Sequence, residues 1–63
     1  MKRRYKGSFQ TWFGHFLIPG AVYDIYETRN MRGYEHCEIT VKIFGRSCPY
    51  TTRKIFDMIW EPL

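Results

Sequence analysis

Side chains that ligate soft metal ions or act as thiol nucleophiles occur at four positions of the 63-residue chain: His15, His36, Cys37 and Cys48. Structural zinc sites use paired ligands, such as two cysteines separated by roughly two to four residues, and the sequence has no such pair. His36 and Cys37 are adjacent in a segment that we expect to be a strand, where consecutive side chains point to opposite faces. We therefore predict no metal site and no cofactor.

Catalytic chemistry has equally little support. Cys37 falls on the apolar face of the expected strand, where burial raises the pKa of a thiol and makes it unreactive. Glu35 and Glu38 lie on opposite faces of that strand, so they cannot act as a carboxylate pair. The sequence also lacks G-x-S-x-G, H-E-x-x-H and phosphate-loop motifs. We predict that the protein is not an enzyme and that it acts by binding.

The basic residues gather near the beginning of the chain. The net charge is +4, and four of the ten lysines and arginines stand close together there: Lys2, Arg3, Arg4 and Lys6. A nucleic-acid-binding module normally carries a basic stripe on its folded body, whereas the basic and acidic residues balance in the rest of this chain. We expect residues 1–7 to form a flexible basic arm and residues 8–63 to form a single small globular domain.

The content of aromatic residues is the second conspicuous feature, with five Phe, five Tyr and two Trp. So many rings exceed what the thin core of a domain this small can readily cover, so some should be exposed. Exposed aromatic residues with arginines nearby are typical anchors of protein interfaces. Our candidates for such a surface are Trp12, Phe13, Tyr26, Arg29, Arg32 and Tyr34.

Short strands must position these candidates. Residues 34–44 alternate apolar and polar side chains, which predicts a strand with one buried face. Residues 21–27 predict a second strand, entered through Pro19-Gly20, a pair that suits the central positions of a type II turn. The polar connection 28–33 is typical of a hairpin loop, so we expect the two strands to be antiparallel neighbours.

The flanking segments are shorter. Residues 11–18 favour a strand broken at Gly14, with a short helical turn as the alternative. Residues 51–60 repeat apolar side chains four positions apart, and Thr51 or Thr52 can serve as an N-cap, so we predict a short helix, with a strand as the alternative. The fold class is therefore α+β: a small antiparallel sheet or SH3-like open barrel of three to four strands with a short C-terminal helix.

Several stretches of the sequence resemble small uncharacterised phage-encoded proteins. They are Lys6-Gly7, the Pro19-Gly20 turn leading into Val22–Tyr26, and the ending from Cys48-Pro49-Tyr50-Thr51-Thr52 through Phe56 to Trp60–Leu63. The resemblance implies the bacterial cytoplasm during infection as the setting. Because many such proteins bind and redirect a host protein, it also implies a protein partner.

The leading prediction is a non-catalytic protein-binding module, a phage-encoded inhibitor or adaptor of a host protein, with a homodimer through the same rings as a further option. The alternative is a small nucleic-acid-binding protein that contacts phosphates with Lys2, Arg3, Arg4 and Lys6 and stacks Tyr5 on a base. The two predictions differ in salt dependence, since binding to phosphates weakens steeply as ionic strength rises.

Location is predicted from what the sequence lacks. No apolar run approaches the roughly 20 residues of a membrane span, and the basic residues 1–6 lead into a polar stretch instead of an apolar signal core. Two cysteines are fewer than a secreted domain of this size usually carries, so we expect free thiols, with a Cys37–Cys48 disulfide as the alternative. We therefore expect a cytoplasmic protein without a membrane partner.

Overall fold

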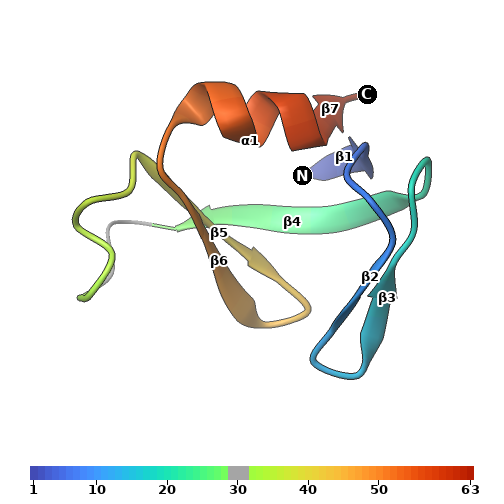
Figure 1. Ribbon diagram of the computed structural model, residues 1–63, viewed down its shortest axis with the longest axis horizontal. Coiled ribbons are helices and arrows are strands. Elements are labelled where there is room, and N and C mark those ends of the chain that lie inside the picture. Colours follow the sequence, from blue (N-terminus) through green and yellow to red (C-terminus); the bar gives the residue numbers. More distant parts are fainter. Residues whose placement is uncertain (29–31) are drawn as a thin grey trace.

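The computed structural model describes residues 1–28 and 32–63 (Figure 1). In this part of the chain it contains seven strands and one helix, in the order β1 (Lys2–Tyr5), β2 (Gln10–Trp12), β3 (His15–Leu17), β4 (Val22–Thr28), β5 (Ile39–Ile43), β6 (Arg46–Tyr50), α1 (Arg53–Ile59) and β7 (Trp60–Pro62). Five strands form an antiparallel sheet in the order β6-β5-β4-β1-β7, and β2 pairs with β3 in a separate hairpin.

The coarse fold prediction, a small antiparallel sheet with a short C-terminal helix, is confirmed. The strands that the structure describes do not close into a barrel, so the SH3-like alternative is not confirmed. The structure also contains more than the three to four strands that we predicted. Several of the additional strands are only three residues long, too short for an alternating pattern to reveal them.

The two strands predicted in the middle of the chain are present and antiparallel. In β4 the side chain of Ile25 is buried while Tyr26 is exposed, and Ile25 pairs with Ile43 of β5. However, β5 begins at Ile39 and not at residue 34. Residues 34–38 form turns instead, and the amide of Cys37 donates to the carbonyl of Tyr34 over 3.0 Å. The local turn therefore takes the first half of the alternating segment out of the sheet.

The structure differs from the expectation of a flexible arm over residues 1–7. Strand β1 lies inside the sheet, between β4 and β7, with Arg3 opposite both Tyr23 and Pro62. The charged side chains of Lys2 and Arg4 are exposed, and Tyr5 is buried. A segment rich in charges forms this central strand because one of its faces meets solvent.

Arg3 is the exception, since it lies on the same face of β1 as buried Tyr5. Its guanidinium donates to the carbonyl of Trp60 over 3.1 Å and to the carboxylate of Asp57 over 3.3 Å. It also lies over the Phe56 ring, 4.7 Å from the ring centroid. These partners compensate for removing a charge from water, and they explain why a basic residue faces the core side of the sheet.

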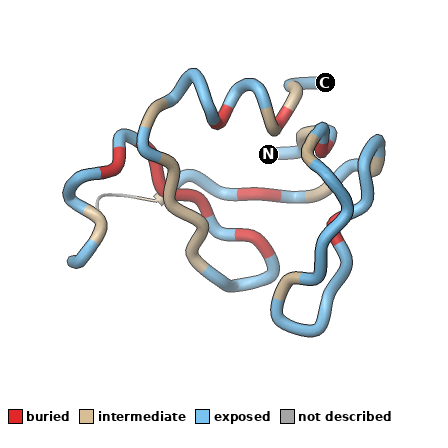
Figure 2. Tube along the Cα trace, viewed as in Figure 1, coloured by how far each residue is buried: buried red, intermediate tan, exposed pale blue. Residues whose placement is uncertain are grey.

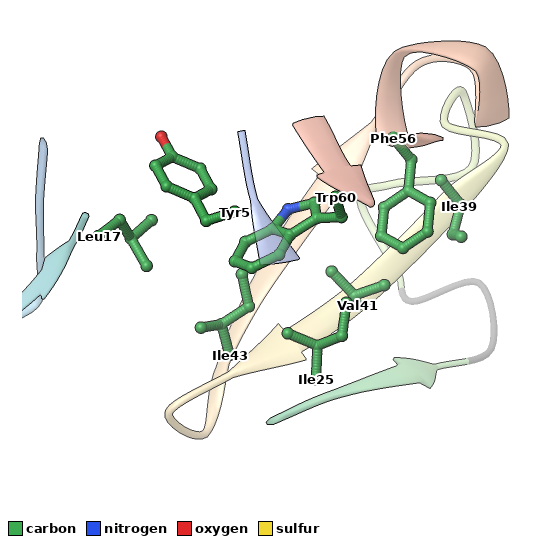
Figure 3. Packing of buried hydrophobic residues seen from close by; sticks show 8 residues of the cluster. All are labelled: Tyr5, Leu17, Ile25, Ile39, Val41, Ile43, Phe56 and Trp60. Atoms are coloured by element: carbon green, nitrogen blue, oxygen red, sulfur yellow. The ribbon is translucent and has the colours of Figure 1, made fainter. Parts of the chain in front are cut away.

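The core lies between the sheet and α1, as the buried positions in Figure 2 show. Phe56 and Trp60 are fully buried against the branched side chains of β4 and β5 (Figure 3). The rings of Tyr5 and Trp60 lie 5.0 Å apart and link β1 to β7. The two largest fully buried side chains, Trp60 and Phe56, thus come from the last part of the chain, and Trp60 packs on Tyr5 of β1.

The C-terminal segment confirms the predicted helix and its cap. The hydroxyl of Thr52 accepts a hydrogen bond from the amide of Ile55 over 3.2 Å. The helix ends at Ile59, because Trp60 is already part of β7 and lies opposite Tyr5. The predicted turn at Pro19-Gly20 is also present, with Gly20 at a φ of 89°.

Candidate functional site

Two turns of the same sequence, Phe-Gly, join neighbouring strands. Phe13-Gly14 connects β2 to β3, which confirms the predicted strand with a break at Gly14, and Phe44-Gly45 connects β5 to β6. The φ angles are 46° and 84° in the first turn and 54° and 76° in the second. Positive φ at both central residues is the geometry of a type I′ hairpin turn, which favours glycine and is uncommon for phenylalanine. Each turn therefore displays one phenylalanine at its tip.

The two turns contact each other reciprocally. The guanidinium of Arg46, just after the second turn, lies 4.5 Å from the centroid of the Phe13 ring. The His15 ring, just after the first turn, stacks on Phe44 at 4.0 Å with an interplanar angle of 10°. In addition, Trp12 Nε1 donates to the carbonyl of Ile43 over 3.3 Å.

These contacts turn two separate hairpin ends into one surface. Figure 1 shows both turns at the same end of the molecule. We call this surface the tip patch and define it as Trp12, Phe13, His15, Phe44 and Arg46. Phe13 is 62% exposed and Phe44 is 43% exposed, so both rings lie at the surface despite their contacts.

A second pair of rings lies on the other face of the β2–β3 hairpin. Phe16 and His15 are consecutive in β3, so their side chains point to opposite faces. Phe16 stacks on Phe9 with ring centroids 5.8 Å apart, and both rings are more than half exposed. Figure 2 shows that most of this hairpin is exposed. The hairpin therefore presents phenylalanine rings at its tip and on one face.

Hydrogen bonds from tyrosine side chains hold the hairpin against the sheet. The Tyr23 hydroxyl accepts from the amide of Ile18 over 2.9 Å and donates to the carbonyl of Phe16 over 3.0 Å. Leu17 is buried in the core cluster. The exposed rings thus stand on a backbone that is fixed from the opposite side.

The start of the hairpin is held in the same way by Tyr5. Its hydroxyl donates to the carbonyl of Ser8 over 2.7 Å and accepts from Gln10 Nε2 over 3.2 Å. A tyrosine hydroxyl is protonated at neutral pH and can make both bonds, and burial raises the pKa of Tyr5 further. A Cβ at Gly7 would lie 2.5 Å from this hydroxyl, so the approach to β2 requires a glycine there.

The charges differ between the two ends of the molecule. The described ion pairs join Met1 to Asp24, Arg3 to Asp57 and Arg53 to Glu27, at 3.1 to 3.3 Å, and none of them involves the hairpin or the tip patch. Residues 5–23 and 39–52 contain no Asp or Glu. The charged side chains of these two segments are therefore the basic ones of Lys6, Lys42 and Arg46.

The structure divides the interface that we predicted. Trp12 and Phe13 belong to the tip patch, although Trp12 is half-buried and serves to fix the hairpin. Tyr26 is exposed on the outer face of β4, where its hydroxyl donates to Asp24 over 3.0 Å. Two further predicted residues, Arg32 and Tyr34, belong to the segment 32–38, which lies at the opposite end of the sheet from the hairpin (Figure 1).

In that segment Arg32 is exposed and Tyr34 is half-buried, while Arg29 lies outside the described residues. The structure therefore does not bring Tyr26, Arg32 and Tyr34 together with Trp12 and Phe13. The residues predicted for the alternative function, nucleic-acid binding, are also divided. Lys2, Arg4 and Lys6 are exposed, while Arg3 is half-buried. Tyr5 is only 3% exposed, so its ring is not free to stack on a base.

Sequence reasoning missed His15, Phe44 and Arg46 in the tip patch, and the ring pair of Phe9 and Phe16. One signal was available, since the dipeptide Phe-Gly occurs twice and each copy separates two extended segments. The contacts between the two copies gave no signal, because they join residues about 30 positions apart in the chain, such as Trp12 and Ile43 with a separation of 31.

The cysteines serve the core. Cys37 is buried, Cys48 is half-buried, and both are free thiols in the structure. Cys48 Sγ donates to the Tyr50 hydroxyl over 3.3 Å, which also accepts from Trp60 Nε1 over 2.8 Å. Burial raises the pKa of the Cys48 thiol, which disfavours the reactive thiolate.

Comparisons with protein-family models, with curated proteins and with solved structures found no match to this chain. Within residues 1–28 and 32–63, no group of three or more His, Cys, Asp or Glu side chains is arranged to hold a metal ion, and no pocket opens at the surface. No helix in that same part of the chain is both long enough and apolar enough to cross a membrane.

Proposed function

We propose that the protein is a non-catalytic protein-binding module that contacts its partner through the β2–β3 hairpin and the tip patch. One observation carries the proposal: Phe13 and Phe16 on the hairpin, and Phe9 directly before it, are each more than half exposed, while the hairpin backbone is fixed to the sheet. A phenylalanine side chain has no hydrogen-bonding group, so burying it leaves no polar atom unpaired. Burying one against a partner contributes about 1.5–3 kcal/mol before the cost of association.

The hydrogen bonds that fix the backbone beneath these rings support the same proposal. Ordering flexible side chains or loops on binding reduces affinity, and an interface that is fixed beforehand avoids this cost. Tyr5 and Tyr23 hold the hairpin from the sheet side by hydrogen bonds, and Leu17 of the hairpin is buried in the core cluster. A partner would therefore meet rings whose positions are largely set before contact.

The edges of the sheet favour binding through side chains over addition of a strand. The edge strands are β6 and β7, and they contain Pro49 and Pro62. Proline has no backbone N–H to offer to an added strand, and proteins commonly place it on edges for that reason. The hairpin and the tip patch remain the more suitable contact surface.

We further propose that the partner is a host protein and that the module is a phage-encoded inhibitor or adaptor acting in the bacterial cytoplasm. The support for this part is the sequence resemblance to small phage-encoded proteins.

A relation to SH3-like barrels is supported by the strand pairing, in which β1 pairs with both β4 and the final strand β7. A homodimer through the same rings is the competing arrangement, and light scattering of the purified protein distinguishes it.

An affinity pull-down from bacterial lysate, read by mass spectrometry with and without nuclease, tests the proposal. We expect one stoichiometric protein that persists after nuclease and is lost with the double substitution Phe13→Ala and Phe16→Ala. Met58→Ala is the matched control, because Met58 is equally exposed but lies on α1, away from the hairpin. A partner captured equally by all three proteins would contradict the proposal.

The nucleic-acid alternative uses a different surface. Lys2 and Arg4 are exposed on the outer face of the sheet, and Tyr26 and Lys42 are opposite each other on the same face. Asp24 and Glu61 share that face and reduce its net charge. Deleting residues 2–6 would remove a central strand, so the test is Lys2→Gln with Arg4→Gln. Loss of binding to oligothymidylate with this pair, together with a steep salt dependence, would favour the alternative.

A further inference from the structure

The guanidinium of Arg46 can bind a carboxylate, but no carboxylate pairs with it in the described residues. Its guanidinium lies against the face of the Phe13 ring, 4.5 Å from the centroid. An arginine stacked in this way keeps the N–H groups at its edge available, and these groups fit a carboxylate with two parallel hydrogen bonds. No described residue forms an ion pair with Arg46.

The same chain contains a completed version of this arrangement. Arg3 lies over Phe56 at 4.7 Å, and its guanidinium also donates to the Asp57 carboxylate over 3.3 Å. Both pairs thus combine an arginine with a phenylalanine ring at nearly the same distance. In the pair on α1 the carboxylate comes from the next residue after Phe56, whereas the residue after Phe13 is Gly14. The pair at the hairpin has the cation and the ring but lacks the acid.

The surroundings of Arg46 are complementary to an acidic partner. Residues 5–23, which include the β2–β3 hairpin, and residues 39–52, which include the β5–β6 turn, contain Lys6, Lys42 and Arg46 and no acidic residue. An approaching carboxylate would therefore meet no repulsion from these segments, while an approaching cation would gain no ion pair there.

We propose that the tip patch binds an acidic segment of a protein in which a carboxylate pairs with Arg46 and adjacent apolar side chains cover Phe13 and Phe44. This inference rests on the proposed protein-binding function and specifies the chemistry of the partner. The carboxylate supplies orientation and selectivity against basic segments. The rings supply the apolar contact area.

Selection from a random peptide display library on the immobilised protein tests this inference. We expect the selected peptides to be enriched in Asp and Glu relative to the unselected library and to contain apolar residues beside the acids. A synthetic peptide from the selected pool should bind Arg46→Gln about tenfold more weakly than the original protein, the factor expected for losing a charge-assisted pair of hydrogen bonds. Circular dichroism of Arg46→Gln confirms that the variant is folded.

The matched control is Lys54→Gln, which removes one positive charge from an exposed position on α1. It should bind the same peptide with nearly unchanged affinity. Equal losses in Lys54→Gln and Arg46→Gln would show that only net charge matters and would overturn the inference.

Further outcomes separate the inference from the function on which it rests. The selected peptides could show no enrichment in Asp and Glu and yet bind Phe13→Ala more weakly than the original protein. That result would overturn the inference of an acidic partner and leave the protein-binding function intact. A library that yields no peptide dependent on Phe13 or Arg46 would contradict both. Displacement of the peptide by oligothymidylate, with NMR shifts at Phe13 and Phe44, would identify the patch as a stacking platform for bases and would also overturn the inference.

Discussion

The two ends of the molecule use the same residue types for different purposes. Under α1, an arginine lies over Phe56, which is fully buried, and the arginine is paired with Asp57. At the hairpin, an arginine lies over Phe13, which is 62% exposed, and no described residue supplies an acid. The residue types in these two pairs therefore do not decide the role of the aromatic ring. The role depends on whether another element covers the ring.

The position of α1 over the sheet follows from its direct connection to β7. The helix leads directly into β7, and the pairing of β7 with β1 places Phe56 over the sheet and makes Trp60 part of it. The hairpin instead leaves the sheet between β1 and β4 and returns to it, and hydrogen bonds from Tyr5 and Tyr23 hold only one of its sides. The helix side therefore covers its rings, whereas the hairpin side leaves exposed the rings that we propose to contact a partner.

The largest expected effect is on stability. Replacing Phe56 with Ala should cost about 3–5 kcal/mol, which a domain of this size can hardly tolerate, so we expect a largely unfolded protein. Phe13→Ala should cost about 0.5 kcal/mol or less, because the ring is mostly in solvent already. Urea denaturation followed by tryptophan fluorescence measures both. Similar losses in the two variants would contradict the different roles assigned to Phe56 and Phe13.

The next effect concerns the Tyr50 hydroxyl, which accepts from Trp60 Nε1. Tyr50→Phe leaves the indole N–H of a fully buried tryptophan without this acceptor, so we expect a loss of about 1–3 kcal/mol in the free energy of unfolding. Tyr26→Phe is the control, since among residues 1–28 and 32–63 its hydroxyl bonds only to exposed Asp24. Equal losses in the two variants would contradict the role assigned to Tyr50.

Alkaline pH tests the same buried hydroxyl. Burial raises the pKa of Tyr50 above its ordinary value of 10.0, so folding favours the protonated form. The resulting stability is present below pH 10 and is lost as the pH rises towards the raised pKa. The free energy of unfolding should therefore fall above about pH 10, and less so in Tyr50→Phe. Denaturation at a series of alkaline pH values measures this difference.

A smaller effect distinguishes the two arginines directly. Arg3→Gln should lower the free energy of unfolding by about 1–2 kcal/mol, since it removes the contact with Phe56 and the bonds to Asp57 and Trp60. Arg46→Gln should lower it by about 0.5 kcal/mol and should mainly affect partner binding. Thermal denaturation and the peptide assay are to be run on both. A larger stability loss in Arg46→Gln would reverse the assignment.

The smallest effect is expected at acid pH, on the β1–β4 side. Hydrogen bonds from the N-terminal ammonium and from Tyr26 lower the pKa of Asp24. Stability from this group is present above the ordinary carboxylate pKa and is lost as the pH falls through the lowered value. NMR titration should show the change around Asp24 and none from a carboxylate at the tip patch. Asp24→Asn should slightly flatten the acid dependence, and an unchanged profile would count against the prediction.

Local patterns were sufficient to predict part of the fold. The strand β4, the turn at Pro19-Gly20 and the N-cap at Thr52 each depend on neighbouring residues, and the structure confirms them. The central position of β1 could not be predicted, because a run of basic residues has the composition of a solvated arm. Only the partners of Arg3 and the burial of Tyr5 show why the run is a strand.

The candidate site divides in the same way. The amino-acid composition alone shows that the chain has more rings than its core can cover, and a glycine stands where each hairpin turn requires a positive φ. Which rings remain exposed, and the contacts of Phe13 with Arg46 and of His15 with Phe44, depend on the packing of distant segments. Turn geometry depends on adjacent residues, whereas exposure depends on which distant segment packs over a ring, and that is settled when the whole sheet forms.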